Sequence, residues 1–127
     1  MAAKSRYLII IKSGQLTTEL LDSRFETFFA DNDMIALGAM QALQKNNYCI
    51  PDDISIIGFD DITFCEVFAP GLTTMKVYKK ELGQIAVRKL IELIKSPSQV
   101  KVRTQLCNKL ILRGSVAAPK ENEGVIA

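Results

Sequence analysis

Residues 28–61 have the sequence FFADNDMIALGAMQALQKNNYCIPDDISIIGFDD, and this stretch decides the fold. It contains two apolar runs, one that ends with residues 28–30 and one that spans residues 54–59. A helical pattern lies between them. Unbroken apolar runs are typical of parallel strands that are buried on both faces. A strand–helix–strand unit this short predicts a βαβ crossover. The stretch therefore predicts an α/β fold with a mostly parallel sheet flanked by helices.

Polar side chains follow each apolar run at the point where the predicted strand ends. Asn32 follows the first run and Asp60 the second. In parallel sheets ligands bind beyond the carboxyl ends of the strands, so we predict that Asn32 and Asp60 face one crevice. A carboxylate accepts paired hydrogen bonds from neighbouring hydroxyls, and an amide both donates and accepts. The pair suits a small neutral polyhydroxylated ligand, and Phe59 and Phe64 are candidates for an aromatic face beside it.

Both residues also have a purely structural interpretation. Asn32 stands where a helix N-cap is expected, and Asp60 stands where a strand-end turn residue is expected. A third interpretation is a Mg²⁺-dependent receiver-like domain, because Mg²⁺ binds oxygen ligands such as clustered carboxylates. Its acidic cluster would be Asp31, Asp33, Asp60 and Asp61, completed by Thr73 or Thr74 and Lys76. Those last residues fall inside a predicted strand rather than at its end, which disfavours this interpretation.

The helix between the two runs is apolar on more than one side. One stripe, predicted to lie on the sheet, consists of Ile35, Gly38, Ala39, Ala42 and Leu43. Met34, Leu37 and Met40 occupy the other side of the first two turns. A helix that is apolar all round is buried all round. These three residues therefore need a cover, which is either a local loop or a second subunit.

The rest of the chain gives a coarser pattern. Residues 1–15 contain an apolar run at 7–11 that predicts either an edge strand or a remnant outside the fold, and Glu19–Ser23 suits a short helix. A strand is predicted over 72–77, an amphipathic helix over 79–96, a half-exposed strand over 102–106 and another strand over 110–112. We assign residues 16–116 to one domain and residues 117–127 to a loose tail.

Composition excludes several classes of function. The chain has 127 residues, a net charge of +2 and no histidine. Absence of histidine excludes Ser–His–Asp and Cys–His catalysis within one chain. Three widely spaced cysteines at 49, 65 and 107 form neither a metal motif nor a disulfide framework. There is no signal-peptide or membrane-spanning pattern. We expect a non-enzymatic cytoplasmic protein without cofactor or metal. The nearly neutral charge gives no sign of the clustered basic surface that binds nucleic acid.

Four motifs in order resemble one protein family. ADNDMIALGAMQAL at 30–43, IPDDISIIGFDD at 50–61, APGLTTM at 69–75 and LILRGS at 110–115 resemble the C-terminal effector-binding region of LacI/GalR-family transcription regulators. The resemblance covers residues 16–115. It implies half of a periplasmic-binding-protein-like fold and effector contacts at Asn32 and Asp60. It also implies a repressor that responds to a sugar or related metabolite and dimerises through this subdomain.

The resemblance also sets expectations about partners. For the dimer interface we predict five residues: Met34, Leu37, Met40, Gln41 and Phe68. The family's helix-turn-helix headpiece and first subdomain have no counterpart in this sequence, so DNA contact is expected only through a headpiece absent from this chain. In the family the helix matching residues 79–96 belongs to that first subdomain, so here its apolar stripe lacks a sheet and predicts a homodimer or higher oligomer. The alternative function is a stand-alone sugar-binding protein of the periplasmic transport type.

Overall fold

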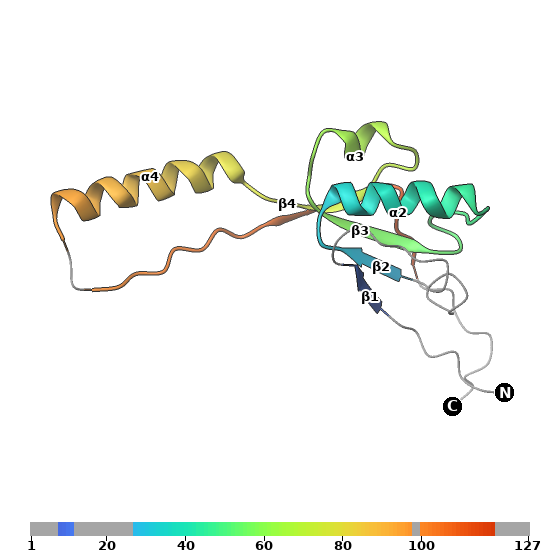
Figure 1. The fold of residues 1–127 in the computed structure, drawn as a ribbon, viewed down its shortest axis with the longest axis horizontal. Helices are drawn as coiled ribbons and strands as arrows, with labels where there is room; N and C mark the ends of the chain where they lie inside the picture. The colour runs from blue at the N-terminus through green and yellow to red at the C-terminus, as the bar shows by residue number, and fades with distance from the viewer. Residues whose placement is uncertain (1–7, 12–26, 98–99, 119–127) are drawn as a thin grey trace, which may run out of the picture.

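The computed structural model describes residues 8–11, 27–97 and 100–118, the first of these by their backbone alone. Within them, five strands form one sheet: β1 (Leu8–Ile11), β2 (Thr27–Ala30), β3 (Ser55–Asp60), β4 (Thr73–Lys76) and β5 (Lys109–Ile111). They lie in the order β1-β2-β3-β4-β5 (Figure 1). Strands β1 to β4 are parallel, and β5 runs antiparallel to β4. The predicted α/β fold with a mostly parallel sheet is confirmed.

One face of the sheet packs against the helix α2 (Asp33–Lys45). Phe28 and Ile56, on β2 and β3, are buried in the same apolar core as Met40 and Leu43 of α2. The alternate residues of these strands, such as Phe29 and Ile57, are only half-buried. Figure 1 shows α2 and the short helix α3 (Phe64–Val67) on the same side of the sheet.

The predicted orientation of α2 was partly wrong. Leu37 and Met40, which we placed on the side away from the sheet, are 8% exposed and fully buried, respectively. Gly38, which we placed on the sheet, is exposed and has open space where a Cβ would stand. The helix turns its bulky side chains inward because they fill the core better than glycine does. Ala39 and Leu43 are buried as predicted.

The same observation corrects part of the predicted dimer interface. Leu37 and Met40 need no second subunit, because both belong to the apolar core of the chain itself, against which Ile62 and Phe68 also pack. Met34 is 64% exposed and Gln41 is also exposed, so these two remain available to a partner.

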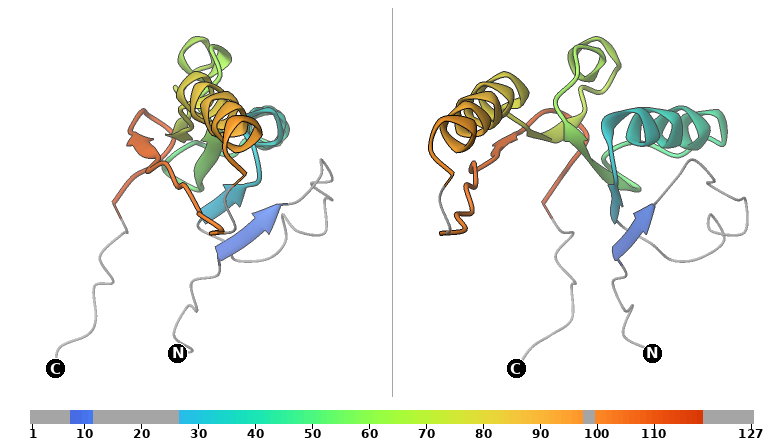
Figure 2. Two further views of the ribbon diagram at one scale, coloured as in Figure 1. Left: turned by 90° about the vertical axis from the view of Figure 1, so that its left-hand side faces the viewer. Right: turned by 60° about the vertical axis from the view of Figure 1, so that its left-hand side comes forward.

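The C-terminal part of the structure leaves the sheet and returns to it. Helix α4 (Lys79–Lys95) buries none of its residues, and the segment after it leads back to β5. Figures 1 and 2 show the helix and the described part of this segment extending away from the sheet, and we call residues 79–97 and 100–108 the arm. The helix was predicted; the strand over residues 102–106 was not found, because no neighbouring strand pairs with it in the described part of the chain. The predicted helix at 19–23 and most of the tail lie outside the described residues.

Residues that follow β5 link two central strands of the sheet by hydrogen bonds. The Ser115 hydroxyl accepts a hydrogen bond from the Thr73 amide (2.8 Å) and donates one to the Ile56 carbonyl (2.6 Å). The Ile56 amide in turn donates to the Ser115 carbonyl (2.8 Å). Ser115 is buried and bridges β3 and β4. The end of the LILRGS motif therefore stabilises the contact between these two strands.

Candidate functional site

The candidate site lies at the carboxyl edge of β2 and β3. These strands are parallel neighbours in the register Thr27↔Ser55 and Phe29↔Ile57. Extended past the end of β2, the same offset brings Asn32 level with Asp60. The structure thus places both residues at one edge of the sheet, where a ligand of a parallel sheet would sit.

Asn32 caps α2. Its Oδ1 accepts a hydrogen bond from the Ile35 amide (3.0 Å), and its backbone is extended. This satisfies one of the orphan amides of the first helical turn. Within the described part of the chain its amide nitrogen makes no hydrogen bond. The side chain can therefore cap the helix with its oxygen and offer its nitrogen to a ligand.

Asp60 ends β3 and pairs with the start of the arm. Its Oδ1 lies 3.2 Å from Lys79 Nζ, and its side chain is 34% exposed. Ion pairs at such exposed positions add little stability. The Asp60 carboxylate can therefore exchange Lys79 for ligand hydroxyls at small cost.

Asp33 is a structural centre that the sequence analysis did not identify. It is buried and receives a hydrogen bond from the Ile62 amide at Oδ2 (2.9 Å) and one from the Thr74 hydroxyl at Oδ1 (2.5 Å). Burial, and then a hydrogen bond to Asp33, raise the pKa of the Cys65 thiol to about 12. A Cβ on Gly58 would collide with the Asp33 carboxylate, so only glycine fits there. Asp33 ties α2 to β4 and to the α3 segment.

Asp61 and Arg113 form a second polar centre beside the site. Asp61 Oδ1 accepts a hydrogen bond from Arg113 Nη2 (2.8 Å), and Asp61 Oδ2 lies 3.6 Å from Lys76 Nζ. Arg113 Nη2 also donates to Glu66 Oε1 (3.1 Å). Burial acts to lower the pKa of Arg113, but the hydrogen bonds to Asp61 and Glu66 outweigh it and raise that pKa. Arg113 was not predicted as a site residue, because its only signal in the sequence is its place in LILRGS.

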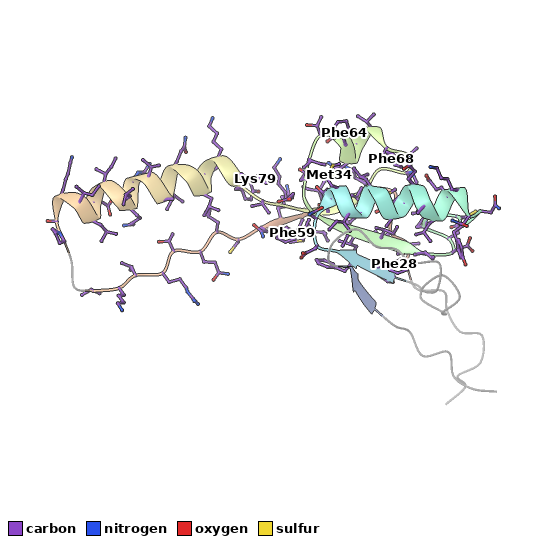
Figure 3. All side chains as sticks on the ribbon, in the orientation of Figure 1. Phe28, Met34, Phe59, Phe64, Phe68 and Lys79 are labelled. Atoms are coloured by element: carbon purple, nitrogen blue, oxygen red, sulfur yellow. The ribbon has the colours of Figure 1, made fainter. Side chains whose placement is uncertain are left out.

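The two aromatic candidates come from different elements. Phe59 is half-buried on β3, and Phe64 is 62% exposed on α3. Figure 3 labels both rings, Phe59 on β3 and Phe64 on α3. Of the two rings, Phe64 presents the larger free surface to a ligand.

The Mg²⁺ interpretation finds no ligand set. In the described ranges no group of three or more acidic, cysteine or histidine side chains is placed to hold a metal. Asp33, Asp60 and Asp61 are each paired with protein donors instead. None of the helices in the described ranges has the length and the apolar content that a membrane span requires.

Comparison with known proteins decides the family. Residues 4–116 match the model of the periplasmic binding protein-like domain. The chain belongs to this family. Over 118 residues this periplasmic binding protein-like domain is 36% identical to the HTH-type transcriptional regulator GalR of Streptococcus thermophilus, covering 84% of this chain and 36% of the relative. Over 92 residues it is 40% identical to the ribose operon repressor of Escherichia coli K12, covering 72% of this chain and 28% of the relative.

Solved structures agree with the sequence relatives. A LacI family transcriptional regulator from Enterococcus faecalis V583, described with bound ribose, superposes with a TM-score of 0.74 at 37% identity. The match covers 80% of this chain and 38% of that one. The resemblance to LacI-family regulators is confirmed, and the periplasmic binding protein-like domain corresponds to part of their effector-binding region. It spans only about a third of the length of the relatives it matches.

Proposed function

We propose that the chain is the effector-sensing region of a LacI-type transcriptional repressor and responds to a sugar or a related small metabolite. The observation that supports this most directly is the placement of Asn32 level with Asp60 at the carboxyl edge of neighbouring parallel strands. The ribose bound to the E. faecalis regulator and the name of the E. coli ribose operon repressor support the sugar class.

The proposed binding chemistry uses hydrogen bonds and one apolar contact. The Asp60 carboxylate accepts hydrogen bonds from two neighbouring hydroxyls and releases Lys79, while the Asn32 amide donates to a third oxygen. Phe64 covers the apolar face of the sugar ring. The regulatory effect comes from binding alone, because bound ligand favours one of two states of the whole repressor.

Partners follow from the same proposal. The homodimer uses a surface that includes Met34 and Gln41, both exposed on α2. Operator binding belongs to a separate helix-turn-helix domain, and the regulator works in the cytoplasm. A transport-type sugar-binding protein has less support, because the curated relatives named above are transcription regulators.

The test measures sugar binding to Asp60 variants. We expect ribose, or another member of a panel of pentoses and hexoses, to bind the wild-type chain in isothermal titration calorimetry. Asp60→Asn removes charged acceptors and should weaken that binding by about tenfold or more. Asp52→Asn is the matched control, because Asp52 is an exposed turn residue before β3, at the opposite edge of the sheet. Equal effects of the two substitutions, or no binding of any sugar in the panel, would contradict the proposal.

A further inference from the structure

Arg113 joins three segments that lie far apart in the sequence. Its side chain is only 14% exposed. Its Nη1 donates to the Leu72 carbonyl (2.9 Å) before β4, and its Nη2 donates to Asp61 after β3 and to Glu66 in α3. The backbone of Arg113 is fixed as well, because its amide donates to the Thr73 hydroxyl oxygen (2.9 Å). Arg113 is therefore held both at its backbone and at its guanidinium group.

The segment that Arg113 holds has an unusual backbone. Asp60 has a φ of 120° and Asp61 a φ of 56°, so two consecutive residues with side chains occupy the left-handed half of conformational space. Such conformations are disfavoured outside glycine and persist only where the surroundings determine them. The Asp61 carboxylate, 11% exposed, is the group that anchors this turn.

Asp60 depends on that anchor for its direction. Its side chain pairs with Lys79, which is itself exposed and cannot hold the carboxylate in one place. The orientation of that carboxylate is set by the backbone angles of Asp60 and Asp61. We propose that Arg113 is a positioning residue of the effector site, which fixes Asp61, and through it Asp60, in the direction that a polyhydroxylated ligand requires. This inference rests on the proposed sugar-sensing function.

An arginine is needed for this role because three acceptors lie in different directions. The planar guanidinium has five donors in fixed directions, whereas a lysine ammonium is a point charge on a flexible stem. A lysine in place of Arg113 would satisfy one acceptor at a time. Glu66 is the least constrained of the three acceptors, since its side chain is 74% exposed, so loss of its contact should cost least.

A double-mutant cycle tests the coupling between Arg113 and Asp60. Arg113→Lys should weaken ribose binding by about tenfold or more in the wild-type background. In the Asp60→Asn background it should weaken the residual binding by less than about twofold, because the group it positions is gone. Equal losses in both backgrounds, or no loss in either, would overturn the proposal. A purely structural role would give equal losses.

A second measurement separates this inference from the proposed function. If the wild-type chain binds no ribose, the proposed function fails, and amide hydrogen exchange still reports on the loop. Arg113→Lys should speed exchange at Ile62 and Cys65 by about tenfold and leave Met40 and Leu43 in α2 unchanged. Lys76→Gln, which removes the weaker contact to Asp61, is the matched control and should change neither set. Unchanged exchange at Ile62 in Arg113→Lys would overturn the proposal.

Discussion

At the scale of single residues, Asp33 connects more of the molecule than any residue we selected from the sequence. Its two carboxylate oxygens serve the Thr74 hydroxyl, the Ile62 amide and the Cys65 thiol. These partners come from segments that follow β3 and from β4 itself. Burying a carboxylate costs little free energy only when its oxygens accept hydrogen bonds. Here protein donors supply those hydrogen bonds.

We expect Asp33→Ala to lower the free energy of unfolding by about 3 kcal/mol, because it leaves a buried hydroxyl and amide without an acceptor. Urea denaturation followed by circular dichroism measures this. Asp31→Ala is the control: Asp31 is an exposed neighbour, and its loss should change stability by less than about 0.5 kcal/mol. Similar losses for both variants would show that Asp33 is not the connecting residue.

Only part of the site could be predicted from the sequence. The edge that bears Asn32 and Asp60 follows from two apolar runs and the rule for parallel strands. The role of Asp33 does not, because capping alone accounts for an acid at a helix start, and its partner Thr74 stands 41 residues away. The same holds for Arg113, whose partner Asp61 is 52 residues distant. Long-range polar pairs leave no local pattern.

Cysteine reactivity gives a second test at this scale. The pKa of Cys65 is raised from 9.0 to about 12, so its thiol stays protonated at pH 8, and its side chain is buried. Cys49 and Cys107 are exposed. Since the thiolate is the reactive form, a thiol-specific reagent at pH 8 should label Cys49 and Cys107 and spare Cys65 until the chain is unfolded in urea. Labelling of Cys65 in the native protein, located by mass spectrometry, would contradict this environment.

At the scale of elements, sequence patterns that allow a single interpretation were predicted well. The continuous apolar runs indicated β2 and β3, and the single amphipathic stripe indicated α4. Sequence patterns that allow two interpretations did not predict the structure correctly. Helix α2 has apolar residues on both sides, so its sequence does not say which side meets the sheet, and the alternation at residues 102–106 does not say whether a partner strand exists.

Two methionines test the corrected orientation of α2. Met40 is fully buried and Met34 is 64% exposed, although both lie on the side we first assigned to a partner. Met40→Ala should destabilise the chain by about 2–4 kcal/mol, because it removes core contacts and leaves a cavity. Met34→Ala should change stability by less than about 0.5 kcal/mol. Chemical denaturation of both variants at a low protein concentration measures the difference. Equally small effects of the two substitutions would support the first orientation, which places both methionines on the side away from the sheet.

At the scale of the whole molecule, the net charge of +2 conceals a separation of charge. The arm has seven basic and two acidic residues, whereas the other described residues from 27 to 118 have seven acidic and four basic ones. The arm also exposes large apolar side chains, among them Leu82, Leu90 and Leu93. An exposed apolar stripe of this length is unusual in a monomer, and the opposite charges of the two parts favour contact between copies.

We expect the chain to self-associate at micromolar concentration. Light scattering should return the mass of a dimer or a higher oligomer. Leu90→Glu places a charge in the apolar stripe of the arm, and Met34→Glu places one on the proposed α2 surface. Each substitution should shift the mass toward the monomer. A monomeric mass for the wild-type chain would contradict the prediction. Co-migration of the chain with added duplex DNA would instead show that the basic arm binds nucleic acid.

The pairing of β4 with β5 makes the arm an insertion in the topological sense. Lys76 and Lys109 face each other in the antiparallel register, so the chain leaves the sheet and re-enters it between directly paired residues. A two-residue Asn-Gly hairpin turn can join such residues. Replacing residues 77–108 by Asn-Gly shortens the closed loop and should stabilise the sheet by on the order of 2 kcal/mol of loop entropy. Retention of the five-stranded sheet by NMR would show that the fold is modular; its loss would show that the arm is a folding requirement.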